Sequence, residues 1–124
     1  MGDTTKIRLP NGEEMERIFP DALIMDSGYK AKFDMLIENN ARAGMVLSHI
    51  ITKMDEDGIY IGSVREISEN IGYSTATVNR AIKVLKADYS SLVTIKKTYS
   101  ETQPIVNMFI IDKGRCFRSG VNER

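Results

Sequence analysis

The chain has 124 residues, one cysteine, one histidine and no net formal charge. This length suffices for one domain with its own core, and a lone cysteine excludes an internal disulfide and a cysteine-cluster metal site. No apolar run approaches the roughly 20 residues that span a bilayer, and the amino terminus lacks a signal-peptide pattern, so we expect a cytoplasmic protein with no membrane contact.

Charge is distributed unevenly along the chain. Residues 1–62 hold seven Lys and Arg against eleven Asp and Glu, whereas residues 63–124 hold ten against six. The first part therefore carries a net charge of minus four and the second a net charge of plus four. A basic half within a neutral chain is typical of a protein that binds nucleic acid through one face.

Residues 1–38 predict an extension that precedes the main domain. Asn11-Gly12 is a strong hairpin signal and lies inside a predicted hairpin over residues 6–19. Residues 22–25 suit a further short strand, and residues 29–38 suit a helix. Because the main domain can form its core without this extension, we expect the extension to build the contact of a homodimer.

Residues 41–54 predict the most buried helix of the chain. Its apolar side chains form two adjacent stripes at a spacing of four, namely Ala43, Val46, Leu47, Ile50, Ile51 and Met54. His49 lies at the margin of these stripes, where a partly exposed residue without a function is expected. Residues 55–58 suit a turn, because they lack the spaced ligands of a calcium loop, and residues 59–61 suit a short strand.

The segment from Ser63 to Leu85 has the pattern of a helix–turn–helix. Ser63 and Glu66 match a capping box at the start of a first helix, and Gly72 suits its left-handed stop. Ser74 suits the N-cap of a second helix. The inward face of the second helix would be Val78, Ala81, Ile82 and Leu85, and its outward face Thr75, Thr77, Asn79, Arg80 and Lys83.

Two runs rich in β-branched and aromatic residues, 91–97 and 105–111, predict a hairpin after the second helix. A helix–turn–helix followed directly by a hairpin is the order of a winged helix. We therefore predict an α+β fold in one domain: a winged helix–turn–helix over residues 41–111 with a small antiparallel sheet. The N-terminal extension, a hairpin plus a helix, precedes it, and a basic tail over residues 112–124 follows.

The outward face of the second helix suits duplex DNA. The expected base readers are Thr75, Ala76, Asn79 and Arg80, because Arg matches guanine, Asn matches adenine and a methyl group matches thymine. The expected contacts to the sugar–phosphate backbone are Ser63, Ser74, Thr77, Lys83 and the wing residues Lys96, Lys97 and Thr98. Arg80 could instead pair with a carboxylate of the preceding helix, such as Glu69.

Several phrases of the chain carry a resemblance to a known family. They are the helix 41–54, the strand 59–61, Ser63–Ile67, Ile71–Ser74, Thr77–Leu85, Val106-Asn107 and Lys113-Gly114. From about Phe33 to Gly114 the chain resembles the RepL family of plasmid replication initiators from Gram-positive bacteria, and related winged-helix replication proteins of phages. The resemblance implies sequence-specific binding of double-stranded DNA at a replication origin, with replication proteins as further partners.

Three alternatives to this interpretation can be distinguished. A transcriptional repressor of a plasmid or phage operon would use the same winged helix, and a protein-interaction domain would expose an apolar face instead of the polar, basic one seen here. An enzyme would need a nucleophile motif, a phosphate-cradling glycine loop or a histidine cluster for metal, none of which the sequence contains. We therefore expect no catalytic activity and no cofactor.

Overall fold

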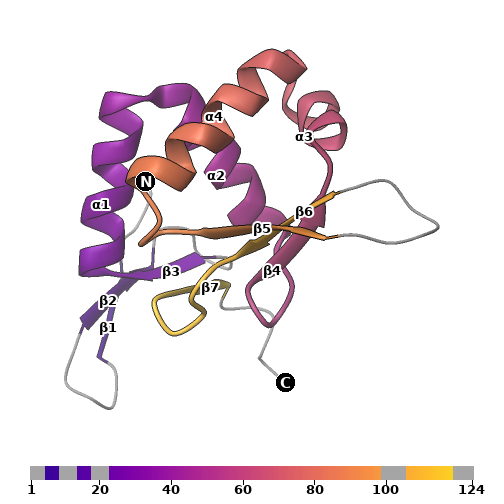
Figure 1. Ribbon diagram of the computed structural model, residues 1–124. Helices are drawn as coiled ribbons and strands as arrows, with labels where there is room; N and C mark the ends of the chain where they lie inside the picture. Colours follow the sequence, from indigo (N-terminus) through magenta and orange to yellow (C-terminus); the bar gives the residue numbers. More distant parts are fainter. Residues whose placement is uncertain (1–4, 9–13, 18–22, 99–105, 119–124) are drawn as a thin grey trace.

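The computed structural model describes residues 5–8, 14–17, 23–98 and 106–118. The elements, in chain order, are β1 (Thr5–Arg8), β2 (Glu14–Arg17), β3 (Leu23–Asp26), α1 (Ser27–Asn39), α2 (Ala41–Lys53), β4 (Ile59–Gly62), α3 (Val64–Ile71), α4 (Thr75–Asp88), β5 (Thr94–Thr98), β6 (Val106–Ile110) and β7 (Cys116–Arg118). The helices gather on one side of the molecule and the strands on the other (Figure 1). The predicted α+β class is confirmed.

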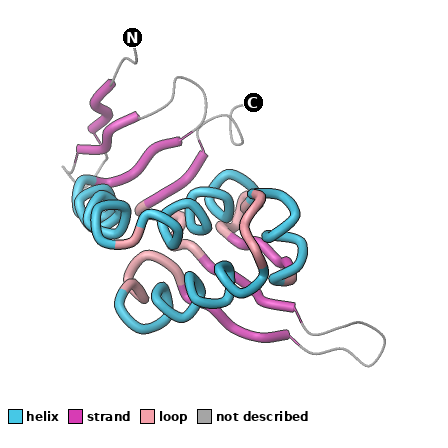
Figure 2. The backbone as a smooth tube through the Cα atoms, turned by 90° about the horizontal axis from the view of Figure 1, so that it is seen from above, coloured by secondary structure: helices cyan, strands magenta, loops and turns pink. Residues whose placement is uncertain are grey.

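The strands form two separate antiparallel sheets. One has the order β1-β2-β3-β7, and the other has the order β4-β6-β5. Seen from above, the first sheet and the β5–β6 hairpin extend away from the helices in opposite directions (Figure 2). The predicted turn at Asn11-Gly12, the tip of the wing over residues 99–105 and the last residues 119–124 lie outside the described residues.

The second sheet combines with three helices in the order that the sequence predicts. β4, which follows α2, pairs with β6, and β6 pairs with β5. The helices α3 and α4 lie between β4 and β5 in the chain. This arrangement is compatible with a winged helix in which β5 and β6 form the wing.

Short polar side chains fix where the helices begin. The Asp26 carboxylate accepts a hydrogen bond from the Tyr29 N–H, so α1 begins two residues before the predicted start at residue 29. Ser63 and Glu66 form the predicted capping box of α3, and Gly72 ends that helix at φ 81°. Ser74 caps α4 as predicted.

The core lies between the helices and β6, which is the central strand of the second sheet. Phe109 of β6 is fully buried, as are Ile67 of α3 and Leu85 of α4. The helix α2 supplies the most buried face, as predicted, with Ala43, Gly44, Val46, Leu47, Ile50 and Ile51. The positions of α4 that face this core are those expected from the spacing of its apolar residues, Val78, Ala81, Ile82 and Leu85.

The N-terminal extension differs from the expectation, because part of it belongs to the core. Met25 of β3 and Tyr29 and Leu36 of α1 are fully buried. The Tyr29 hydroxyl also donates a 2.7 Å hydrogen bond to the Leu92 carbonyl, which lies just before β5. Residues 23–38 are therefore needed for the fold, and they are not an appendage free to serve a dimer contact alone.

The expected basic tail also differs from what the structure shows. Residues 116–118 form β7, which pairs with β3 in the N-terminal sheet. Arg115 donates hydrogen bonds from Nε and Nη2 to the two carboxylate oxygens of Asp26, at 2.8 and 3.2 Å. Arg115 therefore links the end of β3 to the segment just before β7 rather than reaching out to DNA.

The Asp26–Arg115 pair predicts how stability depends on pH. Burial raises the pKa of Asp26, but hydrogen bonds from Arg115 and the Tyr29 N–H outweigh burial, so this pKa lies below its ordinary value. A carboxyl group with a depressed pKa stabilises the fold above its unfolded-state pKa, and the stabilisation is lost as the pH falls through the folded-state pKa.

We expect Asp26→Asn to lower the free energy of unfolding by about 1 kcal/mol at neutral pH, since water around the partly exposed Arg115 screens the lost charge. The amide can still accept the Tyr29 N–H bond, so the helix cap is retained. Urea denaturation at a series of pH values should show the deficit shrinking below about pH 4. A deficit that grows in acid would contradict this role of the ion pair.

Candidate nucleic-acid interface

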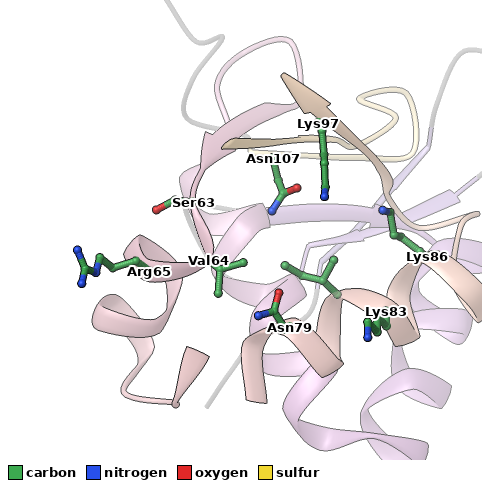
Figure 3. Close-up of a pocket in the computed structure, with 9 residues that line it drawn as sticks. Ser63, Val64, Arg65, Asn79, Lys83, Lys86, Lys97 and Asn107 are labelled. Atoms are coloured by element: carbon green, nitrogen blue, oxygen red, sulfur yellow. The ribbon is translucent and has the colours of Figure 1, made fainter. Parts of the chain in front are cut away.

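A hollow of about 410 Å³ lies between the start of α3, one face of α4 and the wing (Figure 3). We call it the wing-side hollow. It is lined by Ser63, Val64, Arg65, Asn79, Ile82, Lys83, Lys86, Lys97 and Asn107. Four of the predicted DNA contacts, Ser63, Asn79, Lys83 and Lys97, thus come together around one cavity.

Helical and strand periodicity explain why these side chains meet. Asn79, Lys83 and Lys86 are separated by four and three residues, so they share one face of α4. Lys97 and Asn107 are direct cross-strand partners of β5 and β6. Figure 3 shows both of these wing side chains pointing towards α4, with Lys86 at the side of the hollow.

The wing-side hollow is strongly basic. Four of its lining residues are cationic, Arg65, Lys83, Lys86 and Lys97, and its described lining includes no carboxylate. All four are exposed to solvent, although Arg65 points away from the other labelled side chains. Cations gathered without a neutralising acid produce a positive potential that attracts phosphate.

The wing residues predicted to bind DNA do not act as one group. Successive side chains of a strand point to opposite faces of a sheet. Lys97 lies on the same face of the sheet as the buried Phe109, and this face is turned towards α4. Lys96 pairs with Met108, and both side chains lie on the other face. Thr98 also lies on that other face and donates a 3.3 Å hydrogen bond to the Val106 carbonyl. Among the predicted wing contacts, Lys97 is the one that lines the wing-side hollow.

Two predicted phosphate contacts, Ser63 and Ser74, have structural duties at helix starts. Ser63 Oγ accepts the Glu66 N–H at 3.0 Å, and Glu66 Oε1 accepts the Ser63 N–H at 2.9 Å. Ser74 Oγ accepts the Thr77 N–H at 3.1 Å and lies 3.0 Å from Thr77 Oγ1. Thr75 and Ala76, in the first turn of α4, are exposed.

Arg80 lies on a different face of α4 from Asn79. Its Nη2 donates a 3.3 Å hydrogen bond to Thr77 Oγ1, instead of pairing with the Glu69 carboxylate. Arg80 borders a second hollow, of about 210 Å³, between α4 and the start of α2. We call this the α2-side hollow; its lining residues are Asn40, Arg42, Thr77, Arg80, Ala81 and Val84.

Four residues with groups suited to DNA were missed by sequence reasoning: Arg65, Lys86, Asn107 and Arg42. Lys86 follows Lys83 by three residues, so helical periodicity alone could have found it. The position of Asn107 depends on the pairing register of two strands separated by a turn. The position of Arg42 at the α2-side hollow depends on how α2 packs against α4, which the sequence does not specify.

Comparisons of the chain with family models, with curated proteins and with solved structures give no match. Within the described part of the chain, every helix is too short or too polar to cross a membrane.

Proposed function

We propose that this protein binds double-stranded DNA in a sequence-specific manner, with α4 in the major groove and the wing along the adjacent backbone. The observation that carries the proposal is the wing-side hollow, in which Lys83, Lys86 and Lys97 surround Asn79 with no carboxylate in the described lining. The major groove is about 12 Å wide and admits an α-helix.

The side chains of the hollow divide into two kinds of contact. Lysine ammonium groups suit phosphates, because a flexible point charge finds backbone oxygens without reading sequence. The carboxamide of Asn79 carries one donor and one acceptor side by side, which is the arrangement that pairs with adenine. Asn79 is also exposed, so it can reach a base edge without a change in the fold.

The resemblance to RepL proteins supports a role as a plasmid or phage replication initiator that binds an origin. In this proposal a homodimer binds two half-sites and recruits replication proteins there. Mapping the preferred binding site on the DNA that encodes the protein tests this role. A site within an origin supports an initiator, whereas a site confined to a promoter would point to a transcriptional repressor.

Asn79→Ala tests base reading. We expect the variant to lose about 1–3 kcal/mol of binding free energy on the preferred duplex and much less on random-sequence DNA, because a phosphate-bound protein without this amide no longer prefers one base. Fluorescence anisotropy titrations against both duplexes measure the difference.

Asn70→Ala is the matched control, since Asn70 is an exposed asparagine of α3 that lines neither hollow. It should bind both duplexes like the unmodified protein. Equal losses on preferred and random DNA for Asn79→Ala would contradict a role in base reading.

A further inference from the structure

The helix α4 has a cationic hollow on each of two faces. The wing-side hollow uses Asn79, Ile82, Lys83 and Lys86 of α4, and the α2-side hollow uses Thr77, Arg80, Ala81 and Val84. Within each set, successive residues are three, one and three positions apart along α4. The two sets share no residue. The two hollows therefore flank α4 rather than extend one another.

An exposed ridge separates the two hollows. Ala76, Arg80, Lys83 and Ala87 are all exposed and follow one another at spacings of four, three and four, which places them on one line along α4. Arg80 borders the α2-side hollow, and Lys83 borders the wing-side hollow. The ridge thus carries a cation towards each side and small alanine side chains at its ends.

We propose that the α2-side hollow binds a backbone phosphate of the DNA strand opposite to the one bound by the wing-side hollow. The inference rests on the proposed function, and it adds a second anionic site with its own residues. A major groove has one sugar–phosphate backbone on each side, so a helix lying in it meets one strand on each flank. Cationic hollows on both flanks match that arrangement.

The α2-side hollow has the chemistry of a phosphodiester site. Arg42 and Arg80 supply two guanidinium groups, and Thr77 supplies a hydroxyl. The described lining has no carboxylate to neutralise them. The 3.3 Å bond from Arg80 Nη2 to Thr77 Oγ1 holds the guanidinium at the edge of the hollow, and a guanidinium can bind phosphate through two parallel hydrogen bonds.

Arg80 has a different role at the α2-side hollow from the one that the sequence predicts. Instead of reading guanine, it contacts phosphate there and fixes the rotation of α4 within the groove. Arg80→Gln should therefore weaken binding to preferred and random duplexes by equal factors. A loss confined to the preferred duplex would overturn this assignment and restore Arg80 as a base reader.

Salt titrations of the full-length chain with a short random-sequence duplex test the site. We expect Arg42→Gln to reduce the slope of log affinity against log salt by about one, because one phosphate contact is lost. Arg42→Lys should restore much of the slope. Lys113→Gln is the control, since Lys113 pairs with Asp57 away from both hollows and should leave the slope unchanged.

Neutral methylphosphonate linkages, placed one at a time in the preferred duplex, identify the strand. The unmodified protein should be sensitive on both strands, Arg42→Gln should lose sensitivity on one strand, and Lys97→Gln should lose it on the other. An unchanged salt slope for Arg42→Gln, or losses by both variants on the same strand, would overturn this inference alone. Failure of the unmodified protein to bind any duplex would overturn the proposed function itself.

Discussion

Replacing Lys83, Lys86 and Lys97 together by Gln is expected to weaken duplex binding on the order of a thousandfold. Each lysine would lose a hydrogen bond to a charged phosphate, at about 1.5 kcal/mol, and every 1.4 kcal/mol corresponds to a factor of ten in affinity. All three side chains are exposed, so the fold should be retained. The salt slope should also fall by about three, one for each phosphate.

A second triple variant, in which Lys30, Lys53 and Lys113 are replaced by Gln, provides the control. It removes the same charge from residues that do not line either hollow. Anisotropy titrations over a salt series compare the two variants, and circular dichroism verifies that both are folded. Equal losses of affinity in the two variants would mean that only net charge matters and that the wing-side hollow is not the binding site.

Among the variants considered, Phe109→Ala should lose the most stability, about 3–5 kcal/mol in the free energy of unfolding. Phe109 is fully buried in β6, the central strand of its sheet, and its cross-strand partners are Tyr60 of β4 and Ile95 of β5. Its ring centre lies 5.9 Å from that of Tyr60. Truncation of this side chain would leave a cavity where the sheet of β4, β6 and β5 meets the helices.

Met108→Ala is the comparison for Phe109→Ala in urea denaturation. Met108 directly precedes Phe109 in β6, points to the opposite face of the sheet and is half-buried. We expect this variant to lose clearly less stability, because it leaves no enclosed cavity. Equal losses of stability for the two variants would contradict the placement of the core on the Phe109 side of the sheet of β4, β6 and β5.

The helix–turn–helix could be predicted because local rules determine it. Ser63 with Glu66, Gly72 and Ser74 each act on amides or backbone angles within a few residues, and the structure confirms all three signals. The wing followed from strand propensity, and its pairing with β4 followed from the order of elements. Short-range chemistry and periodicity sufficed for these parts.

The joining of β3 to the C-terminal segment could not be predicted, because it depends on long-range pairing. Asp26 and Arg115 are 89 positions apart, and nothing local to either residue identifies the other. The burial of Tyr29 likewise depends on where α1 packs against the segment before β5. The pairing of β3 with β7 places strands of the expected extension and of the expected tail in one sheet.

The candidate site was predictable along α4 and less so around it. Asn79 and Lys83 follow from the outward face of an amphipathic helix. The separation of Arg80 from Asn79 needed the positions of the neighbouring elements, since α2 borders one residue and the wing borders the other. For Lys96 and Lys97, a shift of register by one residue exchanges the two faces, so only the observed pairing decides between them.

Duplex binding through α4 and the wing is tested most directly by following backbone amide NMR signals as the preferred duplex is added. We expect signals from α4, the start of α3 and β5 to shift together, while those of β3 and β7 in the N-terminal sheet stay in place. No shifts at any DNA concentration, or shifts confined to the N-terminal sheet, would contradict it.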